Sequence, residues 1–285
     1  MQCHPLRNAN MHLDDLLDSK QALPSLPRVI AMVLNELNRE EPDLRTVSQL
    51  INTDIGMTAR LLGLANSAQF NLTNQIGSVA DALAVLGLDQ VRALSMAAAV
   101  AGVFKAVPGM EMQQFWRYSL DVAKLSRKLA RAAHANAGLA FTTGLIHACG
   151  ELVMHLGMPG QMRWLNDQVG PLAMRRDNAE NHLLGYSYVE VGAAFAKSWE
   201  FPDALVDAIA HQRAPFLNDV CEPLAGVVHL AVWRARAHED RLAPGALADS
   251  FPDEVALTLG IDIDEVLQED AIDWTTRQET TSFVA

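Results

Sequence analysis

The stretch that decides the fold reads Phe141-Thr142-Thr143-Gly144-Leu145-Ile146-His147-Ala148-Cys149-Gly150-Glu151-Leu152-Val153. Apolar and small residues dominate it. The pattern continues as a helix to about Leu156, and Gly157-Met158-Pro159 ends that helix. A helix that is apolar on most sides lies inside a core. We therefore expect this stretch to be the central helix of a helical domain.

Outward from this stretch, the rest of the chain also reads as helical. Sustained period-2 alternation is nearly absent, and apolar residues recur at spacings of three and four over windows rich in Ala, Leu and Met. The sequence predicts an all-α fold of two packed helical subdomains. Val107-Pro108-Gly109 marks the boundary, because it separates a run of short helices from a longer one.

The predicted division of the chain has four parts. Residues 1–20 form a lead-in, residues 21–107 the N-terminal helical subdomain, and residues 108–272 the second helical bundle. Residues 273–285 are polar enough to predict a disordered tail. Within the first subdomain, Asp43 is a predicted N-cap, Ser78 and Asp81 resemble a capping box, and Gly87 ends the helix that they begin.

Composition excludes several classes of protein. Of the 285 residues 50% are hydrophobic, which is enough for one large or two medium domains. The three cysteines are too few and too scattered for a disulfide framework or a zinc knuckle, so we expect a reducing, cytoplasmic location. The formal charge of -12 disfavours nucleic acid as a partner.

Membrane insertion is not expected either. The first ten residues lack the apolar core of a secretory signal. The uncharged apolar run from Ala93 to Phe104 is far shorter than the roughly 20 residues that span a bilayer. A basic stripe along the helix from Glu111 to Asn136 is interpreted as a solvated face. It consists of Arg117, Lys124, Lys128 and Arg131.

Four short motifs in a fixed order carry a family resemblance. They are Leu23-Pro24-Ser25-Leu26-Pro27, Ile55-Gly56-Met57-Thr58-Ala59-Arg60-Leu61-Leu62, Ala65-Asn66-Ser67-Ala68 with Phe70, and Ala82-Leu83-Ala84-Val85-Leu86-Gly87-Leu88 followed by Val91-Arg92. The combination closely resembles the HDOD domain, a helical output module of bacterial signalling proteins that is related to the HD phosphohydrolases. Further matches extend the resemblance over about residues 20 to 240, and they imply that the second subdomain is an HD-like helical bundle. These matches are Phe115-Trp116-Arg117-Tyr118-Ser119, Gly144-Leu145-Ile146-His147, Gly185 to Gly192 and Ala208-Ile209-Ala210-His211.

The resemblance also implies where an HD enzyme would hold its divalent metals. Such an enzyme needs converging histidine and aspartate side chains, because the metal activates water and stabilises phosphoryl charge. At the positions that would supply these ligands the chain has Tyr118, Ala148 after His147, Tyr188 and Val232. The histidines that remain, His147 and His211, make a poor divalent site without a carboxylate. We therefore expect no catalysis, no resident metal and no cofactor.

The sequence also contains an alternative set of possible metal ligands. His147, Glu151 and His155 are spaced four residues apart, which would place them along one side of a helix. Two helical turns are a wide span for one ion, and His155 stands between apolar neighbours. The preferred interpretation is that His147 is hydrogen-bonded in a degenerate cleft and that the other two side chains are structural or exposed.

The resemblance thus implies a non-catalytic bacterial signalling or regulatory protein that works by binding. Its partners would be signalling proteins acting in trans, and its oligomeric state is left open. The expected recognition surfaces are the loop containing Asn66, Ser67 and Phe70, and the cleft near Tyr118, His147, Tyr188 and His211.

Two alternatives remain open. The first is a divergent metal-dependent phosphohydrolase or cyclic-nucleotide phosphodiesterase that uses His147 and His211 with unexpected ligands. The second is a cleft that binds a nucleotide without hydrolysing it.

Overall fold

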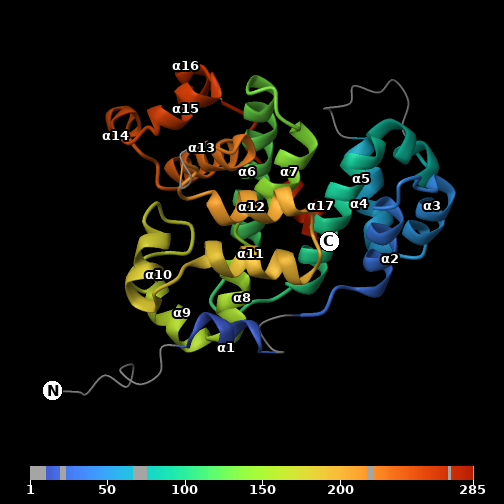
Figure 1. The fold of residues 1–285 in the computed structure, drawn as a ribbon, viewed down its shortest axis with the longest axis horizontal. Helices are drawn as coiled ribbons and strands as arrows, with labels where there is room; N and C mark the ends of the chain where they lie inside the picture. The colour runs from blue at the N-terminus through green and yellow to red at the C-terminus, as the bar shows by residue number, and fades with distance from the viewer. Residues whose placement is uncertain (1–10, 20–23, 67–75, 217–220, 269–270, 285) are drawn as a thin grey trace. The chain divides into compact units, whose positions relative to one another are not determined.

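The computed structural model describes residues 11–19, 24–66, 76–216, 221–268 and 271–284. All regular secondary structure in these residues is helical, which confirms the predicted all-α fold (Figure 1). The helices are α1 (Leu13–Leu17), α2 (Arg28–Leu37), α3 (Leu44–Asn52), α4 (Ile55–Ala65), α5 (Val79–Val103), α6 (Met112–Ala132), α7 (Ala137–Ile146), α8 (Cys149–Gly157), α9 (Pro159–Asn166), α10 (Arg176–Leu184), α11 (Tyr188–Ser198), α12 (Asp203–His211), α13 (Pro223–Glu239), α14 (Pro244–Asp249), α15 (Asp253–Leu259), α16 (Ile263–Leu267) and α17 (Arg277–Val284).

The chain forms two compact units. Unit 1 comprises Met1–Pro24 and Ala106–Thr275, and unit 2 comprises Ser25–Lys105 and Thr276–Ala285. Each unit therefore contains two separate segments of the chain, whereas the sequence indicated one continuous segment for each subdomain. In unit 1 the lead-in helix α1 contacts α11, and in unit 2 the C-terminal helix α17 contacts α4.

Helix α17 corrects the prediction of a disordered tail over residues 273–285. Thr276 and Glu279 cap its start: the Thr276 backbone N–H donates to Glu279 Oε2 over 2.7 Å, and the Glu279 N–H donates to Thr276 Oγ1 over 3.3 Å. This reciprocal pair is a capping box. It supplies side-chain acceptors for two backbone N–H groups at the start of the helix, which have no partner within the helix itself. The polar composition of the tail had concealed this local signal.

In unit 2, side-chain caps set the helix boundaries as the sequence indicated. Asp43 accepts a hydrogen bond from the Arg45 N–H, and Ser78 accepts one from the Asp81 N–H. Helix α5 is broken at Gly87, where φ is +75° and ψ is 164°. Residues other than glycine rarely adopt that backbone conformation, so glycine is suited to this break.

In unit 1, α6 packs against α7 and α13, and α8 packs against α11. The predicted central helix is in fact two helices, because α7 ends at Ile146 and α8 begins at Cys149. At Ala148 the backbone has φ of −105° and ψ of 15°. Hydrophobic periodicity gave no sign of the break, since the residues on both sides of it are buried.

Close backbone contact between α8 and α11 depends on Gly150. A Cβ atom at this position would lie 2.0 Å from the Tyr188 carbonyl oxygen and 2.6 Å from the Gly192 nitrogen. Gly144 on α7 is similarly restricted, because a Cβ there would lie 2.9 Å from the Ala123 Cα on α6. These two contacts fix the ends of the central stretch against their neighbours.

The basic stripe of α6 is not simply a solvated face. Lys124 donates to the Asp273 carbonyl over 3.0 Å, and Lys128 donates to the Ala271 carbonyl over 2.8 Å. Arg117 forms an ion pair with Glu239 of α13 at 2.6 Å. The interpretation from sequence was incomplete because the acceptors lie more than a hundred residues away in the chain.

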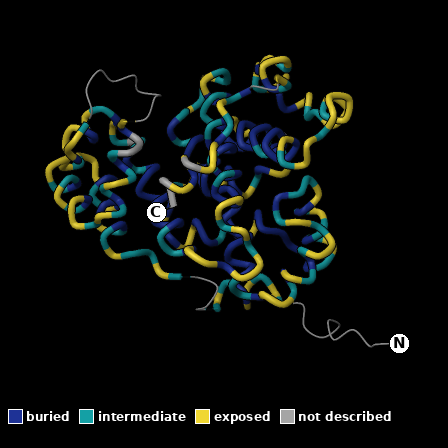
Figure 2. Tube along the Cα trace, turned by 180° about the vertical axis from the view of Figure 1, so that it is seen from behind, coloured by how far each residue is buried: buried dark blue, intermediate teal, exposed yellow. Residues whose placement is uncertain are grey.

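Buried residues gather inside each unit, and exposed residues line the outer turns (Figure 2). By length and composition alone, Ala137–Gly157 could cross a membrane, as could the bent pair Val79–Leu88 and Gln90–Val103. However, 89% of the apolar window in Ala137–Gly157 is buried inside the protein. Such burial is typical of a core helix in a soluble domain.

Candidate functional site

A chain of hydrogen bonds joins three helices in the interior of unit 1. Arg236 on α13 donates from Nε to the Tyr118 hydroxyl on α6 over 3.2 Å. The Tyr118 oxygen lies 3.2 Å from Nε2 of His147, which caps the end of α7. His147 Nδ1 lies 2.6 Å from the Gly144 carbonyl. All three side chains are buried, and we call this group the Arg236–Tyr118–His147 relay.

The relay fixes the tautomer of His147. A carbonyl oxygen only accepts, so Nδ1 must carry the proton and Nε2 must accept from the Tyr118 hydroxyl. Burial, with a smaller effect of the positive charge of Arg236, lowers the pKa of His147 from 6.5 to about 3, although the hydrogen bond to the Gly144 carbonyl opposes the shift. The imidazole is therefore neutral at physiological pH and is free of charge repulsion with the guanidinium.

Arg236 is a buried cation without a carboxylate partner among the residues that the structure describes. Its Nη1 donates to the Ala173 carbonyl over 3.0 Å, and its guanidinium carbon lies 5.2 Å from the centre of the Tyr188 ring. A guanidinium stacked on an aromatic face gains cation–π attraction, which is stronger away from water. An arginine side chain keeps its charge in proteins, so the site holds a permanent positive charge.

A cavity of about 280 Å³ opens beside this cation. Its charged lining residues besides Arg236 are Asp177 and Arg213, which form an ion pair at 2.6 Å, and Arg213 also bonds to Asn178. Asp177 also attracts Arg236, but one carboxylate faces two guanidinium groups, which leaves one net positive charge in the lining. The complete lining is Met174, Asp177, Asn178, Tyr188, Gln212, Arg213, His229, Val232, Trp233, Arg236, Ser250 and Pro252.

Gln212 lines this cavity and contains one unpaired, covered polar atom. Its Nε2 donates to the carbonyls of His147 and Ile209 over 3.1 Å and 3.0 Å, and these two acceptors fix the orientation of the amide. Its Oε1 is buried and has no partner in the described part of the chain. His229 donates from Nδ1 to the Gln212 carbonyl over 2.8 Å, and burial lowers its pKa.

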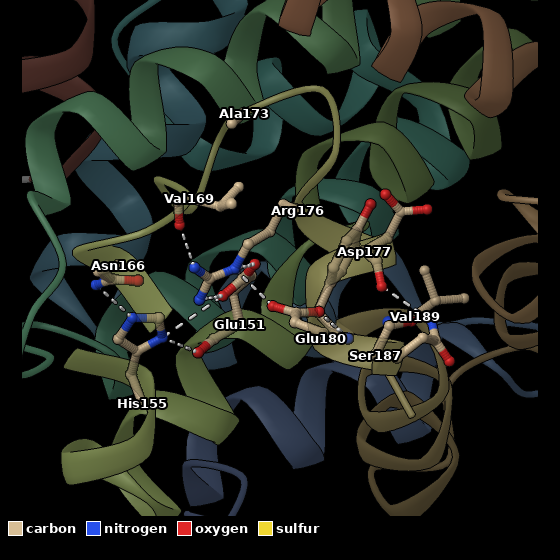
Figure 3. A network of polar contacts seen from close by, with 12 residues as sticks. Glu151, His155, Asn166, Val169, Ala173, Arg176, Asp177, Glu180, Ser187 and Val189 are labelled. Carbon is tan, nitrogen blue, oxygen red and sulfur yellow. Dashed lines mark hydrogen bonds and ion pairs between the residues drawn. The ribbon is translucent and has the colours of Figure 1, made fainter. Parts of the chain in front are cut away.

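A second polar network joins Glu151 of α8 to Arg176 and Glu180 of α10 (Figure 3). Arg176 donates from Nε to Glu151 over 3.0 Å and to Glu180 over 2.7 Å, and all three side chains are fully buried. Glu180 also accepts from the backbone N–H of Tyr188 over 2.8 Å. Burial and the neighbouring Glu151 raise the pKa of Glu180 well above its usual value.

His155 belongs to this second network and not to a metal site. Its Nε2 lies 3.1 Å from the Asn166 amide nitrogen, so Nε2 accepts and Nδ1 donates to the Glu151 carbonyl over 2.7 Å. Burial lowers the pKa of His155. His147 instead contacts Tyr118, so the spacing of four residues does not gather the alternative set around one point.

The donor groups present do not fit a divalent metal of the HD type. In the described residues, no group of three or more His, Cys, Asp or Glu side chains lies close enough to hold an ion. The relay uses both nitrogens of His147 and both roles of the Tyr118 hydroxyl. Val232 lines the cavity with an apolar side chain, and Ala148 is buried without a donor atom.

The structure brings together some of the predicted cleft residues. Tyr118 and His147 share the relay, and Tyr188 joins it through Arg236. His211 does not line the cavity; it bonds to the Asp207 carbonyl at 2.8 Å, and the next residue, Gln212, takes the expected place.

The predicted loop is described only in part. The side chain of Asn66 forms two hydrogen bonds with the backbone of Ile76. Its Nδ2 donates to the Ile76 carbonyl over 2.8 Å, and its Oδ1 accepts from the Ile76 N–H over 2.7 Å. Ser67 and Phe70 lie outside the described residues.

Arg236 and Gln212 were not recognised from the sequence, nor was the pair of Arg176 and Glu180. A signal for Arg236 was present, because Trp233-Arg234-Ala235-Arg236 places charges in an otherwise apolar helix. Charged side chains in an apolar helix are rarely fully buried unless they have a specific role. The Arg176–Glu180 spacing of four residues is, by contrast, common on exposed helix faces and gives no sign of burial.

Comparison with known proteins places this architecture in a family. The chain is 30% identical to a protein from Shewanella amazonensis SB2B whose name proposes a phosphohydrolase, with a TM-score of 0.77 and coverage of 98% of this chain and 99% of that one. It is 25% identical to an HDOD domain protein of unknown function from Geobacter sulfurreducens, with a TM-score of 0.69 and coverage of 92% of both chains.

A shorter match joins the chain to the uncharacterized protein YuxH of Bacillus subtilis, at 30% identity over 60 residues. That match spans 21% of this chain and only 15% of YuxH. The family model of the HDOD domain matches residues 23–215, which include α2 through α12 and with them Tyr118, His147 and Tyr188. On this match and the shared fold, the chain belongs to the HDOD domain family.

Proposed function

We propose that this protein is a non-catalytic signalling protein that acts by binding, with a signalling protein in trans as its partner. The supporting observation is the 3.2 Å contact between Arg236 Nε and the Tyr118 hydroxyl. Tyr118 stands where the family resemblance places a metal-ligating histidine of the HD enzymes. The contact therefore sets a permanent positive charge beside that position.

The charge matters because like charges repel strongly at short range in a buried site. A divalent ion near Tyr118 would face the guanidinium with no carboxylate at Ala148 or Val232 to offset the repulsion. Metal-dependent phosphoryl chemistry needs that ion to activate water. In this proposal the cleft keeps the scaffold of an HD site and uses it for recognition.

Elemental analysis and a hydrolysis assay test the proposal together. Purified protein is assayed with bis-p-nitrophenyl phosphate and with cyclic nucleotides, in the presence of Mn²⁺, Fe²⁺ or Zn²⁺. We expect neither stoichiometric metal nor turnover above that of the His147→Gln variant. Turnover that His147→Gln abolishes and that the exposed-site variant His134→Gln retains would overturn the proposal.

The second candidate is a divergent metal-dependent phosphohydrolase or cyclic-nucleotide phosphodiesterase. The name of the Shewanella relative at 30% identity favours it. It predicts the opposite outcome of the same assay, with metal bound and turnover dependent on His147. His211 bonds to its own helix and does not line the cavity, which leaves this candidate without its second histidine in the cleft.

Binding through the loop of Asn66, Ser67 and Phe70 requires a separate test. Affinity capture from the native cytoplasm is compared for the wild type, Phe70→Ala and Ser67→Ala. Ile55→Ala is the control, since Ile55 is a large apolar residue that is 87% exposed elsewhere in unit 2. We expect Phe70→Ala to lose the partner and Ile55→Ala to retain it; retention by Phe70→Ala with the fold intact would refute the loop assignment.

Asn66 is unsuitable as the first variant in that test. Its side chain bonds to Ile76 on the far side of the loop, so Asn66→Ala would alter the loop ends as well as any contact with a partner.

A further inference from the structure

We propose that the cavity beside Arg236 binds a small organic oxyanion, a carboxylate or a phosphate ester, whose apolar part lies against Trp233. The inference rests on the proposed function, because it assigns a ligand chemistry to the same cleft. The cavity and the permanent charge of Arg236, whose Nε and Nη1 have partners, carry it together.

The charge inside the cavity favours an anion. Asp177 is already paired with Arg213, and His229 is kept neutral by burial, which lowers its pKa. Arg236 has partners at Nε and Nη1, and no hydrogen bond to Nη2 is found in the described residues. A guanidinium is the side chain best suited to carboxylate and phosphate oxygens, because its N–H groups form charge-assisted hydrogen bonds with them.

Size and shape limit the ligand further. A volume of about 280 Å³ is at the small end of the range for ligand cavities, which suits a metabolite and excludes a folded partner. Trp233, Val232 and Met174 supply the apolar wall. Trp233 is itself held in place, because its Nε1 donates to Ser250 Oγ over 3.3 Å and its ring packs edge-on against Phe251.

The test uses four probes on the full chain: mandelate, phenylacetate, mandelamide and phenyl phosphate. Mandelate carries a carboxylate with an adjacent hydroxyl on a phenyl group, phenylacetate lacks the hydroxyl, and mandelamide lacks the charge. Binding is followed by calorimetry and by the side-chain Nε–H resonance of Arg236, which is assigned by its absence from the Arg236→Lys variant. We expect mandelate, phenylacetate or phenyl phosphate to shift this resonance, and mandelamide, which lacks the charge, to have no effect.

Arg236→Met and Arg234→Met form a matched pair of variants. Both arginines are 4% exposed on the same helix, but Arg234 bonds to the carbonyls of Val266 and Gln268 and does not line the cavity. Loss of a charge-assisted hydrogen bond should weaken anion binding about tenfold or more in Arg236→Met and leave it unchanged in Arg234→Met.

The relative affinities of mandelate and phenyl phosphate identify the source of the oxyanion, and tighter binding of either supports the proposal. Equal binding of mandelamide and mandelate would overturn it, as would the absence of any shift at Arg236 in the wild type. The wild-type shift decides the matter even if Arg236→Met fails to fold. Phosphate release from phenyl phosphate is measured separately. Release would contradict the non-catalytic function, whereas the binding measurements test the anion site, so the two proposals are tested by different readouts.

Discussion

Arg236 Nε lies 3.2 Å from the Tyr118 hydroxyl, so a permanent cation and a neutral phenol meet in the interior of unit 1. The phenol donates its O–H to His147 Nε2, and His147 Nδ1 donates in turn to the Gly144 carbonyl. Each contact in the relay thus determines which group donates and which accepts in the next contact. Four consequences of this arrangement and of its surroundings can be measured.

Tyr118→Phe should destabilise the protein more than Tyr188→Phe. Removal of the Tyr118 hydroxyl leaves Arg236 Nε and His147 Nε2 buried without partners, which costs about 1–3 kcal/mol. The Tyr188 hydroxyl has no hydrogen bond in the described residues, so its loss should change stability by less than about 0.5 kcal/mol. Urea denaturation at pH 7 measures both variants, and equal losses would contradict the relay.

Stability should fall below pH 6.5 in a way that depends on His147. Burial lowers its pKa from 6.5 to about 3, so between these values the unfolded chain takes up a proton that the folded chain does not. The free energy of unfolding therefore decreases as pH falls, by at most about 1.4 kcal/mol per pH unit for this histidine. His147→Gln, which cannot take up a proton, should show a shallower decline between pH 6.5 and 4. Identical slopes would mean that His147 is protonated in the folded protein.

The stability of the Glu180→Gln variant should increase, relative to that of the wild type, as pH rises. Burial and the proximity of Glu151 raise the pKa of Glu180, so its stabilising contribution is present at low pH and is lost as pH rises through its folded value. Glutamine keeps an acceptor for the Tyr188 N–H without that penalty. Arg176→Met should instead cost about 3–5 kcal/mol at neutral pH, because it leaves two buried carboxyl groups without their cation. Thermal unfolding at pH 5 and pH 8 tests both variants.

Gly150→Ala should be poorly tolerated, and Gly160→Ala should be neutral or mildly stabilising. The added Cβ at position 150 would lie 2.0 Å from the Tyr188 carbonyl, so α8 and α11 would have to separate, at a cost of about 1–3 kcal/mol or more. Nothing lies within 4 Å of a Cβ at position 160 in α9, where alanine is the better helix former. The difference in denaturation midpoint between the two variants measures the effect. A small change at position 150 would show that the two helices can move apart at little cost.

The sequence was a good guide to local structure. Asp43 and Ser78 cap the helices predicted from them, and Gly87 breaks α5 at the predicted residue, because these signals act through bonds to near neighbours. The break between α7 and α8 was missed, since apolar residues continue through it. The return of the tail as α17 in unit 2 was missed because its cap occupies only two polar residues.

The candidate site was harder to predict than the fold. Tyr118, His147 and Tyr188 could be named because the family resemblance aligns them with metal-ligand positions. Arg236 and Gln212 could not, since their roles depend on contacts with residues 118 and 65 positions away in the chain. A resemblance to enzymes marks the positions where a metal ligand is expected, whereas it gives no information about a cation that approaches them from another helix.

The pairing of Asn66 with Ile76 has a consequence for how the family can diversify. One side-chain amide makes both backbone hydrogen bonds of Ile76, much as two strand residues pair, and so joins the end of α4 to the approach to α5. Because a doubling of loop length adds only about 0.6 kcal/mol of closure entropy, insertions between positions 66 and 76 should leave both helices in place. Selection could then rewrite that segment for new partners while the two helices and their caps stay the same.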